Sequence, residues 1–284
     1  MQKRFVDVVV VSDLHLGTYA CRAKEFLAYL KSISPRLLIL NGDIIIDGWQ
    51  FSKHYFPTVH MAVIQEIFHL LSNGTIVIYI TGNHDEILRR YSDIHLGNFQ
   101  LTDKIVIEIN GKMTWVFHGD VFDHTTRGQA KLWTKLGSNG YASLLAFNSF
   151  INRLMKLVGK KKLSLSKKIM EQFHKRMINI DAFETMIAEL AIEKNYDCVI
   201  CGHIHQPQKR NITTDKGAIT YLNSGDWVEH LTALEYRDDD WHIYSYDESK
   251  MNSVHIPSPK PQTEVMTTEI AIYLHSLSHQ PAVL

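Results

Sequence analysis

The chain alternates short, uninterrupted apolar runs with longer segments in which apolar side chains recur at helical spacing. Apolar runs bounded by polar or turn-forming residues predict strands that are buried on both faces. Five such runs cover residues 8–11, 37–40, 75–80, 114–117 and 198–200. Helical spacing predicts helices over 21–31, 59–71 and 182–194. This alternation predicts a layered α/β fold.

Each of the five predicted strands is followed closely by metal-ligating or polar side chains. In chain order these are Asp13 and His15, then Asp43, then Asn83, His84 and Asp85, then His118 and Asp120, and finally His203 and His205. Open α/β sheets gather functional groups beyond the carboxyl ends of their strands. Glycines within these motifs allow sharp turns and close approach: Gly42, Gly82, Gly119 and Gly202.

The residue types in these motifs are those that two adjacent divalent cations require. A pair of metals about 3.5–4 Å apart needs a bridging carboxylate, together with oxygen and imidazole ligands from separate elements. Any one of the motifs alone is weak, because pairs such as D-x-H arise by chance. All five in this order predict a two-metal phosphoesterase site.

Length and composition narrow the class of protein. The 284 residues suffice for one domain with an insertion, and 30 basic residues balance 30 acidic ones. That balance argues against the basic field of a nucleic-acid-binding protein. The three cysteines give no disulfide framework and fit a reducing compartment. Cys198 and Cys201 are spaced like a redox pair, but their place in a predicted strand favours a structural role. We expect histidines outside the motifs, such as His60, to be surface or packing residues.

The domain boundaries follow from changes in pattern along the chain. We expect a catalytic domain over 1–247, interrupted by an insertion at about 124–182, and a C-terminal extension over 248–284. Prolines at 257, 259 and 261 predict an extended linker, and residues 265–277 a peripheral segment. No apolar run approaches the ~20 residues of a membrane span, and the N-terminus does not look like a signal peptide. We therefore expect a cytoplasmic protein.

The insertion is strongly basic. Residues 151–177 contain one acidic residue, Glu171, and nine basic ones: Arg153, Lys156, Lys160, Lys161, Lys162, Lys167, Lys168, Lys175 and Arg176. Apolar residues at helical spacing lie between them. One interpretation is a helical hairpin packed on the core with a solvated basic face. The other is a lid that offers lysines to phosphate or anionic lipid and an apolar face to acyl chains or the bilayer surface. Charge concentrated in an otherwise neutral chain favours the lid.

Over residues 6–245 these motifs resemble the calcineurin-like metallophosphoesterase superfamily. The resemblance implies a layered β-sandwich flanked by helices, with a helical lid insertion. It also implies two divalent cations in a defined ligand set. Asp13, His15 and His205 would hold the first, Asn83, His118 and His203 the second, and Asp43 would bridge them. Asp47 lies one residue beyond the usual spacing, so its role is open.

A narrower resemblance concerns residues 39–43, 49–53, 80–86, 117–123 and 221–227. These stretches are similar to the UDP-2,3-diacylglucosamine diphosphatase branch, which carries a helical lid in the same position. That branch cleaves a nucleotide-diphospho-lipid sugar of lipid A synthesis to UMP and the acylated sugar 1-phosphate, typically with manganese. With the lid interpretation, we expect Asp123, Lys160, Lys161, Lys167 and Lys168 to contact the substrate, and the protein to work at the cytoplasmic face of the inner membrane. Many members have Arg where this chain has His84.

Two residues next to the metal ligands are candidate catalytic residues. His84 is expected to hydrogen-bond a phosphoryl oxygen or to protonate a leaving group. Asp85 would either orient His84 or cap a helix. Other functions remain open: a phosphodiesterase or phosphatase acting on a soluble nucleotide, a nuclease, or a metal-bound binding module without catalysis. The binding module is disfavoured because no predicted ligand position is replaced. The sequence does not indicate an oligomeric state.

Overall fold

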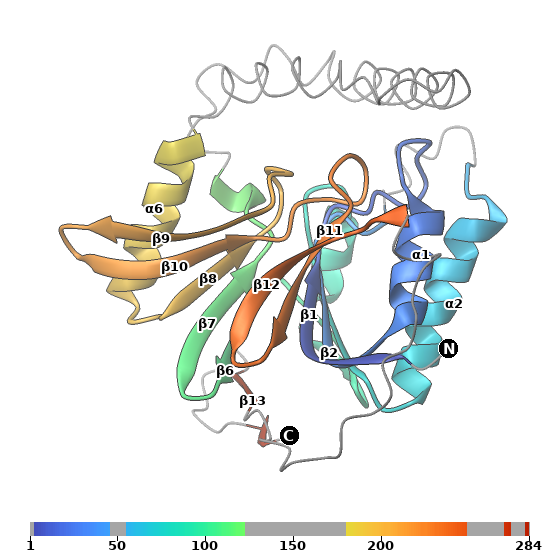
Figure 1. The fold of residues 1–284 in the computed structure, drawn as a ribbon, viewed down its shortest axis with the longest axis horizontal. Coiled ribbons are helices and arrows are strands. Elements are labelled where there is room, and N and C mark those ends of the chain that lie inside the picture. The colour runs from blue at the N-terminus through green and yellow to red at the C-terminus, as the bar shows by residue number, and fades with distance from the viewer. Residues whose placement is uncertain (1–2, 46–54, 123–179, 249–269, 274–281, 284) are drawn as a thin grey trace.

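The computed structural model describes residues 3–45, 55–122, 180–248, 270–273 and 282–283. Within these residues the strands form two sheets of seven strands each (Figure 1). The first sheet has the order β12 (Asp240–Ser245), β11 (Thr232–Arg237), β1 (Arg4–Val11), β2 (Ile33–Asn41), β3 (Ile76–Ile80), β5 (Phe99–Thr102) and β4 (Ile94–Leu96). The second has the order β14 (Ala282–Val283), β13 (Ile270–Tyr273), β6 (Lys104–Ile109), β7 (Lys112–Phe117), β8 (Cys198–Cys201), β10 (Gly217–Asn223) and β9 (Gln208–Thr214).

The two sheets are flanked by helices on their outer faces. Helices α1 (Ala23–Ser32) and α2 (Thr58–Ser72) cover the first sheet, and α6 (Ile180–Glu193) covers the second (Figure 1). Two short 3₁₀ turns, η1 (Glu86–Tyr91) and η2 (Asp120–Phe122), follow β3 and β7. The layered sandwich with flanking helices predicted from the sequence is therefore confirmed, and so are the helices predicted over 21–31, 59–71 and 182–194.

Side-chain alternation along the central strands builds two cores at once. Val8 and Val10 on β1 point between the sheets and pack among the apolar residues of β6, β7 and β8. Val9 and Val11 point to the other face, toward α1 and α2. Successive side chains of a strand face opposite ways, so a strand buried on both faces must be apolar throughout. This requirement explains the uninterrupted valine run.

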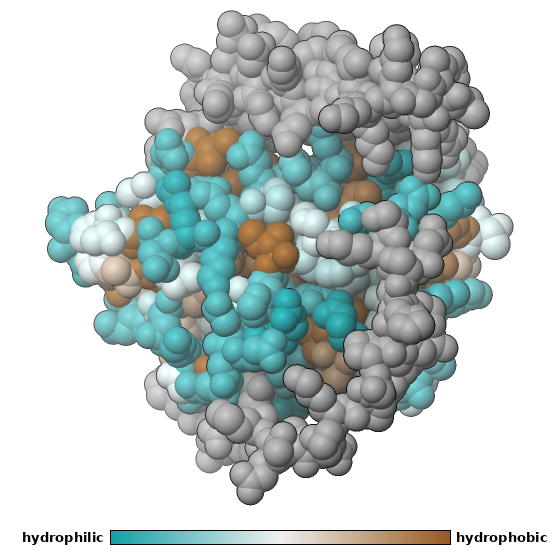
Figure 2. All heavy atoms as spheres, viewed as in Figure 1, coloured by the Kyte–Doolittle hydropathy of each residue, from teal (hydrophilic) through white to brown (hydrophobic). Residues whose placement is uncertain are grey.

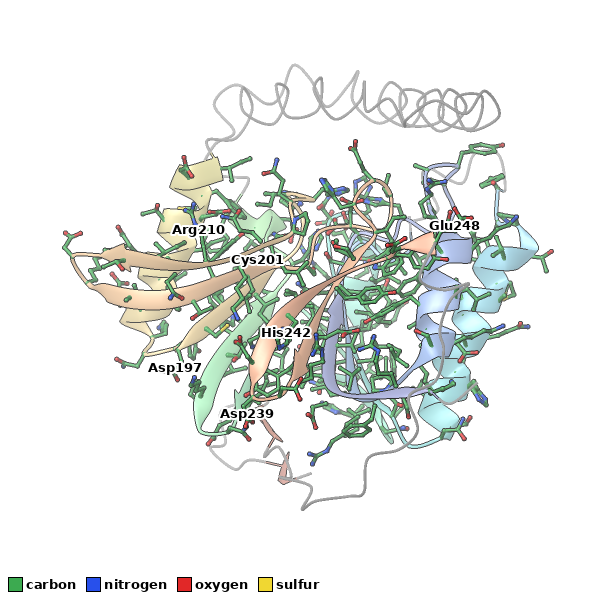
Figure 3. All side chains as sticks on the ribbon, in the orientation of Figure 1. Asp197, Cys201, Arg210, Asp239, His242 and Glu248 are labelled. Atoms are coloured by element: carbon green, nitrogen blue, oxygen red, sulfur yellow. The ribbon has the colours of Figure 1, made fainter. Side chains whose placement is uncertain are left out.

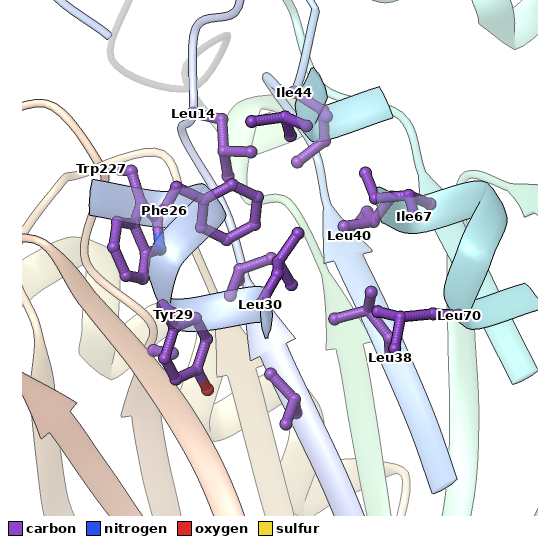
Figure 4. Close-up of a cluster of buried hydrophobic side chains, with 14 of the residues drawn as sticks. Leu14, Phe26, Tyr29, Leu30, Leu38, Leu40, Ile44, Ile67, Leu70 and Trp227 are labelled. Atoms are coloured by element: carbon purple, nitrogen blue, oxygen red, sulfur yellow. The ribbon is translucent and has the colours of Figure 1, made fainter. Parts of the chain in front are cut away.

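The helix-facing core is rich in large rings. Phe26 and Tyr29 of α1 contact the buried Trp227, with ring centroids 4.7 Å and 5.2 Å apart (Figure 4). Leu38 and Leu40 of β2 lie in the same cluster. Full burial of a large apolar side chain contributes about 1.5–3 kcal/mol relative to exposure, so this cluster holds α1 firmly on the sheet. Trp227 belongs to the turn between β10 and β11, so its ring packing places that turn beside the helix layer.

The outer face of the second sheet is closed by α6. Cys198 and Cys201 stand three positions apart on β8, so their side chains face opposite sides of the sheet. Cys198 belongs to the core between the sheets. Cys201, labelled in Figure 3, belongs to the core beneath α6. Both are free thiols, and burial raises the pKa of Cys198 to about 12. The structural role predicted for them is confirmed.

The exposed edges of the fold are mainly polar. Along β9 and β12 exposed side chains alternate with partly or fully buried ones, and the face of the molecule over β9, β10 and β12 is largely hydrophilic with separate apolar patches (Figure 2). Among the described helices, none is long and apolar enough to cross a bilayer.

One strand comes from the predicted C-terminal extension. β13 pairs antiparallel with β6, and Ile272 lies opposite Ile107. The segment 265–277 therefore contributes a strand to the second sheet, which its local pattern did not predict. Most of the predicted insertion at about 124–182 lies outside the described residues, which resume at Ile180. Asp47, Asp123 and the lysines from Lys160 to Lys168 also lie outside them. Their predicted roles, like the predicted domain boundaries, stay predictions.

Candidate metal centre

The predicted ligands follow the carboxyl ends of parallel strands from both sheets. β1, β2 and β3 run parallel in the first sheet, and β7 and β8 run parallel in the second. Five of the site residues adopt left-handed backbone conformations, with positive φ: Asp13 (54°), His15 (53°), Asp43 (55°), His203 (64°) and His205 (55°). Non-glycine residues rarely adopt this conformation and pay about 1–3 kcal/mol when they do. This clustering of backbone strain marks the functional part of the molecule.

The loops after β1 and β2 hold one another through their backbones. The amide of Asp13 donates to the carbonyl of Gly42 (3.1 Å), and the amide of His15 donates to the carbonyl of Asp43 (3.0 Å). The amide of Leu16 continues the pattern to Ile44 (2.9 Å). The sheet ladder therefore extends into the site, which fixes the first carboxylate relative to the second.

Two glycines are required by close approach. A Cβ at Gly42, which has φ of 81°, would overlap the imidazole of His118. A Cβ at Gly202 would lie 2.8 Å from Oδ2 of Asp13. Distances below 3.0 Å are not tolerated by real Cβ atoms, so any side chain at either position would displace a predicted ligand.

Asp13, His15 and His205 form the first group of candidate ligands. Nε2 of His205 lies 3.1 Å from Oδ1 of Asp13 and 3.5 Å from Nε2 of His15. Burial opposes charge on Asp13, but the neighbouring His205 outweighs it and lowers the pKa of Asp13 to about 2. Burial likewise opposes the charged form of His205, whose pKa the Asp13 carboxylate nevertheless raises to about 9. Burial, together with His84, lowers the pKa of His15 to about 3.

Asp43, His118 and His203 form the second group. Nδ1 of His118 lies 2.8 Å from the backbone oxygen of Asn41, an acceptor, so Nδ1 carries the proton. Nε2 of His118 then faces Oδ2 of Asp43 at 3.4 Å. Burial opposes charge on His118, but the Asp43 carboxylate prevails and raises the pKa of His118 to about 10.

Asp43 is common to two groups, since it also clusters with His15 and His84. Its Oδ1 accepts the backbone amide of His84 (2.8 Å), and its Oδ2 lies 3.9 Å from Nε2 of His84. A carboxylate that faces candidate ligands on both sides has the placement expected of a bridging ligand. The predicted bridging position of Asp43 therefore fits the geometry.

The donor set fits divalent cations. Oδ1 of Asp13 and Nε2 of His118 are buried and have no hydrogen-bond partner among the described residues. Buried polar atoms are rarely left unpaired, and here one carboxylate oxygen and one imidazole nitrogen are aimed into the site. Mixed carboxylate and imidazole ligands suit manganese, iron or zinc. A bound cation would take the place of the protons that these groups otherwise share.

Asn83 and His84 differ in their placement. The side chain of Asn83, the predicted ligand, is exposed. His84 is partly buried, and its ring lies 5.0 Å from that of His15. The structure thus brings His84 into the ligand cluster, whereas the role of Asn83 stays a prediction.

Asp85 holds the loop that carries both of these residues. It is buried and accepts hydrogen bonds from the backbone amides of Gly82 and Ile44 and from the hydroxyl of Tyr79. Its side chain forms no capping bond with the following turn η1. Of the two structural roles that the sequence left open for Asp85, helix capping is wrong. Asp85 positions the 82–84 loop against the Asp43 loop.

Sequence reasoning gave no role to several buried or partly buried residues around the ligands. Asn223 donates to the carbonyl of Gly202 (2.7 Å), and Asp226 lies 3.9 Å from Nδ1 of His205. Arg89 forms a 2.6 Å ion pair with Asp120, two positions after His118. The run Asn-Ser-Gly-Asp at 223–226, which follows an apolar strand, is the signal that could have identified the first two.

Comparison with known proteins agrees with this geometry. The family model described as calcineurin-like phosphoesterase matches residues 6–207. A protein of Vibrio cholerae named UDP-2,3-diacylglucosamine hydrolase is 26% identical over 236 residues, which cover 81% of this chain and 95% of that protein. A protein of the same name from Nitrosococcus oceani is 25% identical, over 82% of this chain and 92% of its own length. A third protein of this name, from Aliivibrio fischeri, is 22% identical, over 82% of this chain and 95% of its own length.

The family match spans the described part of the site. It reaches from β1 through β8 and includes all the candidate ligands and the loops that carry them, and it ends before the β10–β11 turn. The chain therefore belongs to the calcineurin-like phosphoesterase family, and it is a metal-dependent hydrolase of phosphoesters.

Proposed function

We propose that this protein hydrolyses the diphosphate bond of UDP-2,3-diacylglucosamine and releases UMP and 2,3-diacylglucosamine 1-phosphate. The proposal rests chiefly on the curated relatives of that name, which align over more than nine-tenths of their own length. The grouped ligands around Asp43 supply the chemistry that such a reaction needs. Manganese is the proposed metal.

The described residues would divide the work between them. When bound, two cations acidify a water and neutralise charge on the phosphoryl oxygens. Asp43, which clusters with His15 as well as with His118 and His203, would bridge the two cations and set their separation. His84, at the partly exposed rim of the cluster, is placed to hydrogen-bond a phosphoryl oxygen. Asp85 keeps the His84 loop against Asp43.

The leaving group decides how much acid catalysis the site must supply. A diphosphate ester releases a phosphate monoester, which leaves readily without full protonation. An alkyl phosphodiester releases an alkoxide and needs a proton donor. His84 therefore acts in the proposed reaction mainly as a hydrogen-bond donor to the transition state.

The lipid part of the substrate is assigned to the basic insertion on sequence grounds alone. Lys160, Lys161, Lys167 and Lys168, with Asp123, are proposed to contact the substrate or an anionic membrane surface. Deletion of residues 151–177 should then spare a small generic phosphodiester and abolish turnover of the diacylated UDP-sugar. Equal loss on both substrates would show that the insertion is structural.

The test of the reaction is a panel of phosphate esters with manganese, followed by mass analysis of the products. The proposal expects UMP from the UDP-lipid sugar with no free inorganic phosphate. Oxygen-18 water would place the label on one product and identify the phosphorus attacked. Turnover of a phosphodiester or phosphomonoester nucleotide, with none of the UDP-lipid sugar, would refute the proposal.

One residue favours a second candidate, a phosphodiesterase or phosphatase acting on a soluble nucleotide. His84 stands where many members of the UDP-2,3-diacylglucosamine diphosphatase branch have Arg. An imidazole can protonate a leaving group at neutral pH, whereas a guanidinium cannot. The same substrate panel separates the two functions, because only this candidate predicts a preference for the poorer leaving group.

A further inference from the structure

The turn between β10 and β11, residues 224–231, carries none of the predicted ligands, yet it supports one half of the site. Its backbone and side chains contact the loops of both Asp13 and His205. These two residues belong to the first ligand group, with His15. Because Asp226 of the turn lies beside His205, this carboxylate is a candidate support for the first cation.

On the Asp13 side the contacts are hydrogen bonds to the end of β1. The amide of Trp227 donates to the carbonyl of Asp13 (3.2 Å). The hydroxyls of Ser12 and Ser224 lie 2.7 Å apart, and Ser12 also donates to the carbonyl of Gly225 (3.0 Å). The turn thus fixes the backbone on which Asp13 stands.

On the His205 side the contact is electrostatic. Oδ2 of Asp226 lies 3.9 Å from Nδ1 of His205, and Asp226 has no exposed surface. Nδ1 of His205 is buried and has no hydrogen-bond partner among the described residues. The opposite ring nitrogen, Nε2, faces Asp13 and His15. A negative charge beside Nδ1 favours the tautomer with its proton there, which leaves the Nε2 lone pair for a cation.

The carboxylate of Asp226 cannot rotate away from this position. Its Oδ1 accepts the backbone amides of Val228 (2.8 Å), Glu229 and His230 (3.2 Å). Its Oδ2 lies 2.6 Å from Nδ1 of His230. Both carboxylate oxygens are therefore held by residues of the turn itself, and Oδ2 of Asp226 stays beside Nδ1 of His205.

We propose that Asp226, clamped by His230, is a positioning residue for the cation held by Asp13, His15 and His205. The inference rests on the two-cation site and is independent of the lipid substrate. The second group has its own support, because the carbonyl of Asn41 orients His118. Removal of the Asp226 charge should therefore weaken one cation site and leave the other unchanged.

The test is Asp226→Asn, which keeps the shape of the side chain and the Oδ1 acceptor for the three amides. Manganese binding is measured by equilibrium dialysis with elemental analysis and by electron paramagnetic resonance. We expect affinity at one site to fall by about 10- to 100-fold, and the signal of a coupled manganese pair to give way to that of a single ion. The thermal midpoint of the chelator-treated protein should stay close to that of the wild type.

The matched control is Glu235→Gln, which changes another buried carboxylate to an amide. Glu235 lies on β11, the strand that follows the turn, and accepts hydrogen bonds from the two terminal guanidinium nitrogens of Arg4 (2.7 Å and 2.8 Å). The partners of the Glu235 carboxylate are Arg4, Tyr29 and Arg237, none of which is a candidate ligand. Both manganese sites should therefore keep their affinity in this variant. Manganese affinity is compared at temperatures equally far below the thermal midpoint of each variant. A general loss of packing is thereby separated from a local effect on one site.

Double variants identify which site is affected. In a His118→Ala background the first site remains, and Asp226→Asn should weaken the remaining ion. In a His205→Ala background only the second site remains, and Asp226→Asn should change nothing. Wild-type affinity at both sites in Asp226→Asn, or equal weakening of both, would overturn the inference.

If Asp226→Asn does not fold, His230→Gln takes its place as the test. It releases the clamp on Oδ2, so a smaller loss at the same site is expected. Unchanged binding in His230→Gln would then overturn the inference. Failure of the UDP-lipid sugar to be cleaved would refute the proposed function while leaving these binding results intact.

Discussion

The backbone oxygen of Asn41 fixes the side chain of His118, with Nδ1 of the imidazole 2.8 Å away. Because this carbonyl accepts the Nδ1 proton, the Nε2 of His118 faces the carboxylate of Asp43 at 3.4 Å. A proton or a cation must lie between these two atoms, since a lone pair and a carboxylate repel each other in a buried site. The same pair of residues thus controls both protonation and metal binding.

The first prediction concerns stability against pH without and with metal. His118 has a folded pKa of about 10 against an ordinary 6.5, so its stabilising effect is present at low pH and is lost as pH rises through that window. The chelator-treated protein should therefore lose free energy of unfolding from about pH 7 to about pH 10. Saturating manganese should reverse this trend, because the cation binds the deprotonated imidazole. Urea unfolding with chelator or manganese checks it, and identical pH profiles would contradict it.

The second prediction concerns Asp43→Ala. Asp43 belongs to the second ligand group and also clusters with His15 of the first, so its loss should lower the occupancy of both cations together and abolish turnover. Elemental analysis of the purified variant after incubation with manganese is the measurement. A variant that keeps one ion at full affinity would show that Asp43 serves one site only. A wild-type protein that never holds more than one manganese would refute the dinuclear site altogether.

Sequence pattern was sufficient for the five strands that lead into the candidate ligands. The valine run before Asp13 could only be a strand buried on both faces, and the polar residues had to follow at its end. The long-range pairing of β13 with β6 was not predictable, because a four-residue strand has no distinctive local pattern. Asp226 was missed for a similar reason, since a buried carboxylate in a turn resembles an ordinary turn residue until its partners are known.

The Asn83–His84 pair shows a different limit of the sequence. Adjacent side chains diverge, so a motif cannot show which of the two faces the cluster. The hydrogen bond from the amide of His84 to Asp43, with Asp85 anchored beneath the loop, decides where these side chains lie. Neither contact follows from spacing along the chain.

The third prediction separates chemistry from metal binding at His84. His84→Ala should lower the turnover number by roughly 100- to 10,000-fold, the range typical of a lost proton donor or hydrogen-bond donor, with metal content unchanged. His84→Gln, which keeps a donor, should recover part of the rate on a substrate with a good leaving group. The comparison uses manganese content and kcat on the same preparations. Loss of one manganese in His84→Ala would make His84 a ligand, as its cluster with His15 and Asp43 allows.

The fourth prediction concerns His60, which joins helix α2 to the ligand loop without contacting the ligands. Its Nδ1 accepts the amide of Gly17 (3.0 Å), so the ring must be neutral at that nitrogen, and burial lowers the pKa of His60 to about 4. The pKa of His60 in the folded protein is below its ordinary value of 6.5. The neutral His60 ring therefore contributes fully to the free energy of unfolding above pH 6.5, and this contribution is lost as the pH falls toward 4.

His60→Gln offers a carbonyl oxygen to the Gly17 amide and does not titrate. We therefore expect this variant to be less stable than the wild type at neutral pH, since it packs less well against Phe56. The difference between the two proteins should shrink as pH falls from about 6.5 to about 4, because only the wild type must then keep a buried imidazole neutral. Urea unfolding at several pH values, in chelator so that the metal ligands do not contribute through bound cations, measures this difference. A difference that stays constant over the window would show that His60 titrates alike in the folded and unfolded states.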